Sequence, residues 1–560
     1  MSLPAELLAR VNAWMAIDPD PDTVSEAQGL VFAADEPALR ERFDGRLAFG
    51  TAGLRGPLGA GPNRINELVV RQTAAGLADY VLATVPGAAE RGVVIGFDAR
   101  HKSDRFAQAT ARVFAAKGMR AMLFSHHVPT PVLAYSVLDL GAAVGVQVTA
   151  SHNPPADNGY KVYWSDGPQI VPPLDEHIAA AIAVVATSPE PVALSGRADV
   201  RIETVGEDVV DRYHLGVQGL DPGTSDAAAR AALRIVYTAM HGVGGADLMR
   251  ALGAAGFSAV EPVPEQFAPD PDFPTVAFPN PEEKGALDLA LALAVSESAD
   301  LILANDPDAD RMAAAIPDPA DPQGWRPLRG DEIGWLLAEH LLSRPATSPT
   351  RRLVCTTIVS SSMLGVMAEK FDVEYRETLT GFKWLARMAL EQKQYVHVLS
   401  YEEALGYCVG GLVRDKDGIS AALVMADLGA SLKAAGSGFA QRLAQLEAEY
   451  GRFDTEQWSL RFDGADAQQK MKDLMEGLRA NLPTTVAGVP VREVRDLSVA
   501  SPGADVVILA LADGARITVR PSGTEPKCKV YFETVTKPGR VPASIAQLKH
   551  AMAEVLGVKE

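Results

Sequence analysis

A chain of 560 residues, of which 47% are hydrophobic and 22% are charged, has a globular balance but is too long for one hydrophobic core, so about three to five domains are expected. The formal net charge of −19 argues against nucleic acid as the main partner, because phosphate backbones bind basic surfaces. The three cysteines are far apart and form no CxxC pair, which argues against disulfides or a cysteine zinc site and favours a reducing, cytoplasmic setting.

The amino-terminal residues 1–20 predict a short amphipathic helix that runs into a Pro-Asp turn. They lack the cationic start and the continuous apolar core of a signal peptide. The longest apolar stretch, near residues 286–295, contains Asp288 and is too short to span a bilayer. We therefore expect no membrane attachment.

Short β-branched apolar runs alternate with Ala- and Leu-rich helical stretches along most of the chain. Such alternation predicts α/β layers, in which ligand-binding groups collect in the loops at the carboxyl ends of the strands. The predicted strands end at Gly-, Asp- or Ser-containing turns and lead toward helices: residues 93–97, 234–237, 301–304, 353–358 and 396–399.

Composition divides the chain at three places: a linker over residues 187–205, a Pro- and Asp-rich segment over 317–324 and a hinge over 434–438. The first three predicted domains are α/β units that share a strand–turn–helix theme without a short-period repeat, and the last is a smaller α+β unit. The predicted domains are 1–205, 206–324, 325–445 and 446–560.

The string Thr-Ala-Ser-His-Asn-Pro-Pro directly follows the apolar run 142–148, and its serine is Ser151. A serine at a strand end, held by a His-Asn-Pro-Pro turn, is rigid and exposed, which suits a group that is phosphorylated and dephosphorylated in place. Lys161, shortly after it, can offer an ammonium to a phosphate or act as an acid or base. A Pro-rich surface turn is the alternative for Ser-His-Asn alone, and the complete string favours the reactive serine.

Asp306, Asp308 and Asp310 alternate in a tight loop after the predicted strand 301–304. Three such carboxylates can converge on one hard cation, and oxygen-only ligands favour Mg²⁺ over zinc. An EF-hand would require Gly and Glu where this loop has Arg311 and Pro317, so that site is excluded. A solvated acidic turn is the remaining alternative, and an arginine able to pair with a phosphate disfavours it.

The string Arg-Pro-Ser-Gly-Thr-Glu-Pro-Lys lies between two predicted strands near the carboxyl end. A guanidinium fork, hydroxyl donors and backbone amides that glycine leaves accessible together suit an anion. The flanking cations favour such a phosphate cradle over a plain Ser-Gly hairpin. The groups concerned are Arg520, Ser522, Gly523, Thr524 and Lys527.

Glu402 and Glu403 follow the predicted strand 396–399 and precede Ala404. Adjacent carboxylates at a strand end suit hydrogen bonding to neighbouring sugar hydroxyls, although paired glutamates also commonly begin helices. Two further turns place a cation beside glycine: Gly50-Thr-Ala-Gly-Leu-Arg55-Gly, and Thr380-Gly381-Phe-Lys383.

Together, TASHNPP, DPDADR and RPSGTEPK in this order resemble the α-D-phosphohexomutase superfamily, which includes phosphoglucomutases, phosphomannomutases and phosphopentomutases. The resemblance runs from Phe49 to Phe532 and implies four domains around a central cleft. It also implies a magnesium enzyme that interconverts the 1- and 6-phosphates of glucose or mannose through a phosphoserine. A sugar 1,6-bisphosphate would be both intermediate and activator, and the enzyme would be a monomer or homodimer.

The resemblance further implies a role for each motif residue. Ser151 would carry the phosphate and, with Asp306, Asp308 and Asp310, would ligate Mg²⁺. Catalysis around that phosphate would involve Ser151, His152, Lys161, Arg55 and Lys383. The phosphosugar would be bound by Arg311, Thr380, Gly381, Glu402, Ala404, Arg520, Ser522, Gly523, Thr524 and Lys527.

One position departs from the hexose pattern, since hexose mutases of the superfamily often have serine where this chain has Ala404. This form of the loop resembles the branch that includes phosphopentomutases, so ribose or deoxyribose 1-phosphate is the alternative substrate. A phosphatase with an aspartate nucleophile, or a non-catalytic sugar-phosphate binder, are the other classes. Neither would require a phosphorylated Ser151 or bisphosphate priming.

Overall fold

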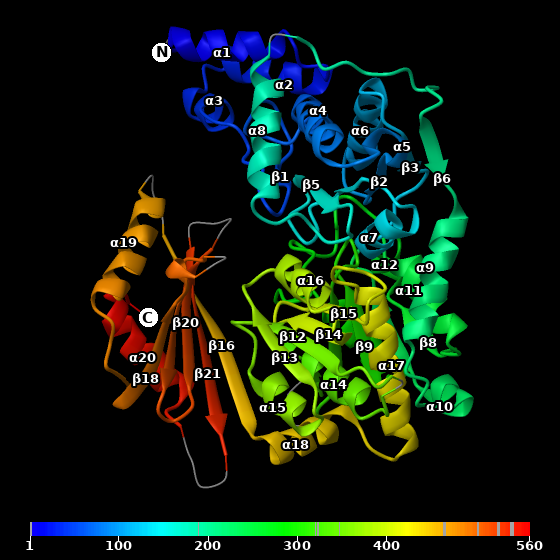
Figure 1. The fold of residues 1–560 in the computed structure, drawn as a ribbon, viewed down its shortest axis with the longest axis vertical. Helices are drawn as coiled ribbons and strands as arrows, with labels where there is room; N and C mark the ends of the chain where they lie inside the picture. Colours follow the sequence, from blue (N-terminus) through cyan, green and yellow to red (C-terminus); the bar gives the residue numbers. More distant parts are fainter. Residues whose placement is uncertain are drawn as a thin grey trace.

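The computed structural model describes residues 3–188, 190–319, 321, 324–346, 348–462, 466–500, 503–522, 527–537 and 542–559. These residues form four β-sheets, each with its own helices, arranged as three α/β units and a carboxyl-terminal α+β unit (Figure 1). The predicted fold class is therefore confirmed.

Three helices precede the first sheet and pack on a small core of their own that includes Leu7, Trp14 and Phe43. The helix expected in residues 1–20 is the first of them, and the Asp20 side chain caps the second by accepting a hydrogen bond from the amide of Asp22. The three helices are α1 (Ala5–Met15), α2 (Pro21–Phe32) and α3 (Glu36–Phe43).

The first sheet has the strand order β1-β5-β4-β2-β3-β6 and is mixed. β4, β2, β3 and β6 run parallel, while β5 pairs antiparallel with both β4 and β1. Its strands are β1 (Leu54–Pro57), β2 (Val93–Phe97), β3 (Ala121–Phe124), β4 (Val144–Val148), β5 (Asp157–Trp164) and β6 (Ile202–Val205), and its helices are α4 (Glu67–Thr84), α5 (Ala88–Arg91), α6 (Ser103–Ala116), α7 (Thr130–Asp139) and α8 (Leu174–Thr187).

The second sheet has the order β11-β10-β9-β7-β8 and is again mixed. β11 pairs with β10, so it belongs to this sheet although it lies just past the expected boundary after residue 324. The strands are β7 (Ile235–Thr238), β8 (Val260–Pro262), β9 (Leu301–Asn305), β10 (Met312–Pro317) and β11 (Trp325–Pro327), with helices α9 (Glu207–Leu220), α10 (Ala227–Ala232), α11 (Gly245–Ala254), α12 (Pro264–Phe267) and α13 (Asp288–Glu297).

The third sheet has the order β13-β12-β14-β15. Its buried helix α17 ends at the predicted hinge over 434–438, where the chain turns into α18. The strands are β12 (Arg352–Thr357), β13 (Glu374–Thr378), β14 (Val396–Glu402) and β15 (Gly406–Val409), with helices α14 (Gly330–Leu342), α15 (Met363–Lys370), α16 (Phe382–Glu391), α17 (Gly418–Ala434) and α18 (Phe439–Tyr450).

The first three sheets share one feature that positions the site. In each, a strand with a parallel neighbour is followed by an antiparallel partner: β4 by β5, β9 by β10 and β14 by β15. The three hairpin connections carry Ser151, the loop with the three aspartates, and the Glu402–Glu403 pair. The expectation that a helix follows the strands at 301–304 and 396–399 is therefore wrong, because each of them continues into a sheet partner.

The fourth unit is an antiparallel sheet with the order β16-β21-β20-β19-β18-β17, drawn in orange to red at the lower left of Figure 1. Arg516 holds it to the third unit through an ion pair with Glu377 at 2.8 Å and a hydrogen bond to the Ser360 carbonyl, and it also pairs with Glu533 of its own sheet at 3.2 Å. Its elements are β16 (Arg452–Arg461), α19 (Ala467–Ala480), β17 (Thr485–Val486), β18 (Val489–Asp496), η1 (Leu497–Val499), β19 (Val507–Leu511), β20 (Arg516–Pro521), β21 (Lys527–Thr536) and α20 (Ile545–Leu556).

Within the described ranges, no single helix combines the length and the apolar composition that crossing a membrane requires. Among the described helices, only α17 and α18 taken together pass by length and composition, and they meet at an angle of 93°. Most of α17 is buried inside the protein.

Candidate active site

Ser151 lies three residues beyond the carboxyl end of β4 and is buried, so the expectation of an exposed serine is wrong: the loop packs against the acidic loop of the second unit. Its φ of 49° is in the left-handed region, which costs a non-glycine residue of order 1–3 kcal/mol unless its surroundings hold it there. Its amide donates to the Thr149 hydroxyl at 2.9 Å, and its own hydroxyl donates to Oδ2 of Asp306 at 2.6 Å. The serine is therefore aimed at the acidic loop of the second unit.

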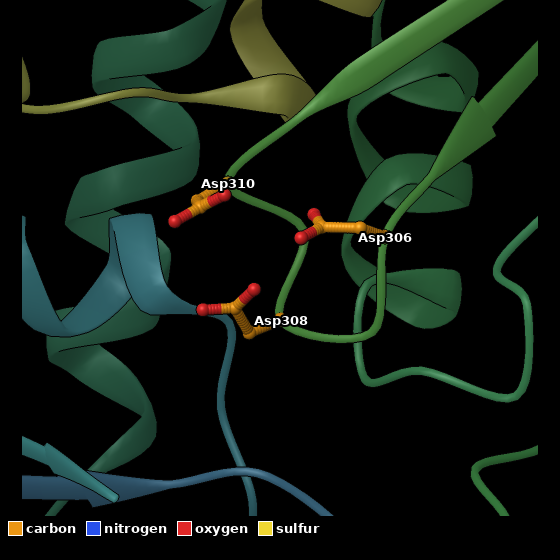
Figure 2. Close-up of side chains that lie close together, drawn as sticks. All are labelled: Asp306, Asp308 and Asp310. Atoms are coloured by element: carbon orange, nitrogen blue, oxygen red, sulfur yellow. The ribbon is translucent and has the colours of Figure 1, made fainter. Parts of the chain in front are cut away.

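Asp306, Asp308 and Asp310 are buried in the connection from β9 to β10, and one oxygen of each lies within 4.8 Å of the others. Figure 2 shows the three side chains projecting from this one loop, with a segment of the first unit beside Asp308. Burial, followed by the charges of Asp310 and Asp308, raises the pKa of Asp306 to about 8. The cluster thus carries more negative charge than its surroundings readily hold.

The chemistry of these donors fits a hard divalent cation. The Oδ1 atoms of Asp308 and Asp310 are buried and find no hydrogen-bond partner among the described residues. Buried carboxylate oxygens without donors are costly unless a cation satisfies them. An all-oxygen set with more than one free lone pair suits Mg²⁺ or Ca²⁺ and not a soft metal.

Two groups of the first unit also reach the aspartates. Lys161, on β5, donates to Oδ2 of Asp308 at 2.7 Å and to Oδ2 of Asp310 at 2.8 Å. Thr130, at the start of α7, donates its hydroxyl to Oδ2 of Asp308 at 2.5 Å and its amide to the Asp308 carbonyl at 2.9 Å. Strand β5 and helix α7 of the first unit are consequently fixed to the loop that carries the three aspartates.

Further predicted cations and the predicted histidine surround the serine. Nη1 of Arg55 donates to Oδ1 of Asn153 at 3.1 Å, and the His152 Nδ1 lies 3.2 Å from the Ser151 hydroxyl. Burial, with Arg311 and Arg55 nearby, lowers the pKa of His152 well below its usual value. The imidazole is therefore neutral near pH 7.

Lys383 joins the third unit to the first at this site. It lies in the first turn of α16 and donates to the Thr51 hydroxyl of the first unit. Burial lowers its pKa to about 8; Asp175 and Glu402 oppose that shift and Arg520 adds to it. Glu402 and Arg520 are thus within electrostatic reach of Lys383, although they belong to different units.

Glu402 and Glu403 have contrasting surroundings. Glu402 is buried at the end of β14, and burial raises its pKa to about 7 while Lys416 acts to lower it. Glu403 accepts a hydrogen bond from Ser360 at 3.0 Å. Ala404 lies in the turn between β14 and β15, so the alternative that the paired glutamates begin a helix is wrong.

The remaining predicted residues belong to the third and fourth units. Thr380 has a buried hydroxyl with no hydrogen-bond partner in the described part of the chain, and Gly381 has a φ of 110° that a side chain would strain. Arg520 is on β20, and the Ser522 amide donates to the Lys527 carbonyl at 2.7 Å. Gly523 and Thr524 lie outside the described residues.

A cavity of about 790 Å³ adjoins this region between the second, third and fourth units. Its lining includes Glu282, Arg329, Glu403, Thr455 and Tyr531. The cavity is large enough for a small ligand, and Glu403 forms part of its wall.

Three residues that were not predicted from the sequence are part of the site around Ser151 and the aspartates. The Nζ of Lys416 lies 3.4 Å from Oδ2 of Asp310, and Oε2 of Glu282 lies 3.4 Å from Nη1 of Arg311. Arg100 donates to the carbonyls around Ser151. A signal existed for Lys416, because Asp-Lys-Asp-Gly places a cation between two carboxylates next to a glycine; Glu282 and Arg100 are in turns that resemble ordinary charged loops.

Four family models match consecutive parts of this chain. They are the phosphoglucomutase/phosphomannomutase alpha/beta/alpha domains I, II and III, over residues 46–187, 217–319 and 329–450, and the C-terminal domain, over residues 470–555.

Relatives with similar coverage carry several substrate names. The chain is 40% identical to a probable phosphoribomutase of Schizosaccharomyces pombe, over 93% of this chain and 92% of that protein. It is 41% identical to a probable phosphomannomutase of Haemophilus influenzae, over 84% and 93%. The human phosphopentomutase is 34% identical, over 99% and 95%.

Among solved structures, a putative phosphomannomutase from Thermus thermophilus superposes with a TM-score of 0.68 at 21% identity, covering 92% of this chain and 99% of that one. This likeness supports the fold. The α/β units bring a buried serine together with an acidic loop whose carboxylates suit a divalent cation. Together with the family models and the relatives, this makes the chain a phosphosugar mutase, an isomerase of carbohydrate metabolism. It belongs to the phosphoglucomutase/phosphomannomutase family of the α-D-phosphohexomutase superfamily.

Proposed function

We propose that the chain moves a phosphoryl group between the two ends of one sugar by way of a phosphoserine at Ser151. The observation that carries this proposal is the 2.6 Å contact between the Ser151 hydroxyl and Asp306, inside a cluster of carboxylates that suits a divalent cation. Asp306, Asp308 and Asp310 would hold Mg²⁺ together with an oxygen of Ser151 or its phosphate. Bound there, Mg²⁺ would neutralise charge on the transferring phosphoryl group.

The protein's own contribution is placement and charge. Phosphoryl transfer depends mainly on positioning and electrostatic stabilisation, so Arg55, Lys161, Lys383 and Arg311 would hold the oxygens of the reacting group. As the bond from phosphorus to the Ser151 oxygen breaks, a bond from phosphorus to the sugar oxygen forms; the sugar hydroxyl gives up one proton and the Ser151 oxygen takes one up, so the step leaves a sugar phosphate and a free serine hydroxyl. Neutral His152 lies close enough to the serine oxygen to hydrogen-bond with it during this exchange.

A complete turnover needs the sugar bisphosphate to reverse its orientation before the serine recovers a phosphate. Water must be excluded meanwhile, since hydrolysis would discharge the phosphoserine. The fourth unit, with Arg520, Ser522, Gly523, Thr524 and Lys527, would hold the distal phosphate and close over the bisphosphate. Added sugar bisphosphate would activate enzyme that has lost its phosphate. The four domains would be residues 1–205, 206–324, 325–445 and 446–560. Strand β11 would belong to the sheet of the second domain, although it lies just past that boundary.

For the sugar, we propose a pentose, ribose or deoxyribose 1-phosphate, converted to the 5-phosphate. Ala404 offers no hydroxyl beside Glu402, and a pentose presents fewer hydroxyls to be matched than a hexose. The names of relatives that span nearly the whole chain, phosphoribomutase and phosphopentomutase, point the same way. Glucose or mannose phosphate is the second candidate, favoured by the relative named phosphomannomutase.

The experiment is a coupled assay of kcat/KM for the 1-phosphates of ribose, deoxyribose, glucose and mannose, each with its own bisphosphate as activator. The variant Ala404→Ser is the matched test of the sugar loop. We expect the pentoses to be preferred and the variant to shift preference toward a hexose. A hexose preferred by the natural chain would overturn the pentose assignment and leave the mutase in place.

We further infer a cytoplasmic enzyme that acts as a monomer or homodimer on a small phosphosugar. Its three cysteines are buried and unpaired, as suits a reducing compartment, and its charge of −19 disfavours nucleic acid. Sedimentation analysis of the purified chain would measure its oligomeric state.

A further inference from the structure

Arg100 forms an unusually complete set of contacts with the loop that carries Ser151. Its Nη2 donates to the carbonyls of Ser151 at 2.6 Å and Asn153 at 2.5 Å. Its Nη1 donates to the carbonyls of Pro154 at 2.8 Å and Asp157 at 3.1 Å. One buried guanidinium therefore satisfies four backbone acceptors of one loop.

This guanidinium is itself held from two directions. Its Nε lies 3.4 Å from Oδ2 of Asp98, at the end of β2, and its planar group lies 4.9 Å from the centre of the Phe273 ring. Asp98 belongs to the first unit and Phe273 to the second. Arg100 thus sits where the serine loop meets the unit that carries the three aspartates.

The other hydrogen bonds of the loop are single contacts, such as those from the Asn153 amide to the Ala150 carbonyl at 3.1 Å and from the Asn153 side chain to Asp157 at 2.8 Å. The loop joins β4 to β5 without a helix or strand of its own, and Ser151 is in the left-handed region. Buried carbonyls without donors are costly, so loss of the fork would let the loop relax and turn the serine oxygen. A lysine keeps the charge but presents a single ammonium and cannot reproduce the planar fork.

We propose that Arg100 is a positioning residue that holds the Ser151 oxygen on the line of phosphoryl transfer. It acts through the loop backbone and does not touch the sugar or its phosphate. This role rests on the proposed function of Ser151. A displacement of about 1 Å of a reacting atom can cost on the order of 100-fold in rate, so the effect on transfer should be large while substrate binding survives.

The test compares Arg100→Lys with Arg91→Lys in the full-length chain. Arg91 is the matched control, because it also binds backbone carbonyls of the first unit, those of Gly141 at 2.9 Å and Ala142 at 3.0 Å, at a turn outside the serine loop. Dephosphorylated protein is mixed with glucose 1,6-bisphosphate or ribose 1,5-bisphosphate, whichever charges the natural chain. Rapid quenching then gives the rate constant for phosphorylation of Ser151, and calorimetry gives the affinity and stoichiometry for the matching sugar phosphate.

We expect Arg100→Lys to slow transfer about 100-fold, with one binding site per chain and an affinity within about threefold of normal. Arg91→Lys should leave both values within about threefold. A merely structural role would instead lower the fraction of chains that bind and leave the rate constant of the remainder unchanged, and that result would overturn the proposal. Equal loss in both variants would overturn it too.

Arg100→Gln provides a second variant if Arg100→Lys does not fold. Its side-chain amide has two N–H donors, so it cannot satisfy all four carbonyls; transfer should slow while binding stays normal, and unchanged transfer would contradict the proposal. Measurements on the natural chain distinguish failure of the proposed function from failure of the positioning role of Arg100. If it never carries phosphate on Ser151, the proposed function fails; if it does and Arg100→Lys transfers normally, only the positioning role fails.

Discussion

The hydroxyl oxygen of Ser151 lies 2.6 Å from Oδ2 of Asp306, although 155 positions separate the two residues in the chain. Ser151 follows β4 of the first sheet, and Asp306 follows β9 of the second. Two units must therefore pack correctly before either motif is complete. Thr130 and Lys161 add contacts of 2.5 Å and 2.7 Å to Asp308 that hold the same junction.

The acidic loop gives the first prediction. Asp308→Asn removes one anionic ligand of a hard cation, so Mg²⁺ affinity and phosphoryl transfer should fall together. Outer-shell changes alone cost about 10–100-fold at metal sites, and a direct ligand should cost at least as much. Activity is measured across a Mg²⁺ titration. Asp104→Asn, at an exposed position in the first turn of α6, is the control and should behave normally. Normal activity of Asp308→Asn at limiting Mg²⁺ would place the metal elsewhere.

The second prediction concerns Arg520. Its proposed fork binds the phosphate that is not reacting, and charge-assisted contacts are worth roughly 1.5–3 kcal/mol. Because closure depends on the same phosphate, Arg520→Ala should impair KM and kcat together, by about ten- to a few-hundredfold, and should release bisphosphate into solution.

Steady-state kinetics with and without added sugar bisphosphate measure this effect. Arg492→Ala, an exposed arginine on β18 of the same sheet, is the control. An unchanged KM with no gain from added bisphosphate would show that Arg520 lies outside the substrate site.

The third prediction is a pH dependence. Burial lowers the pKa of Lys383 to about 8, and a lysine is a cation only below its pKa. If the cation holds the reacting phosphate, kcat/KM should decline as pH rises through about 8. Arginine stays charged, so Lys383→Arg should move that decline to higher pH even if the maximum is reduced. The comparison uses profiles of kcat/KM for the natural chain and Lys383→Arg from about pH 6 to 10, the range in which such a lysine loses its proton. Superimposable alkaline limbs would exclude Lys383 as their cause.

Much of this molecule was predictable from its sequence, for local reasons. Apolar runs ending in Asp- or Ser-containing turns gave β2, β7, β9, β12 and β14, because short buried strands leave a strong apolar signal. Asp306, Asp308 and Asp310 were predicted as one cluster since alternate residues of a tight loop lie close together whatever surrounds them. The hinge over 434–438 was visible as a break between helical stretches.

Long-range relationships were not predictable. The antiparallel partners β10 and β15 continue strands that were expected to lead into helices, because local pattern does not reveal which neighbour a strand pairs with. Arg100 and Glu282 contribute through contacts with distant loops, and nothing near them in the sequence distinguishes them from surface charges. Lys161 was predicted as a phosphate ligand; its ammonium bonds to Asp308 and Asp310, residues that only folding brings beside it.

The most direct test of the central claim is to find where the phosphate resides during turnover. The natural chain, Ser151→Ala and the control Ser165→Ala are each mixed with the activating sugar bisphosphate and quenched, and their peptides are analysed by mass spectrometry alongside steady-state rates. We predict phosphate on Ser151 in the natural chain and the control. In Ser151→Ala we predict none, with turnover lower by several orders of magnitude, about 10³–10⁶-fold, and sugar-phosphate binding retained. Near-normal turnover of a clean Ser151→Ala preparation, or phosphate on the peptide that contains Asp306, would contradict this account.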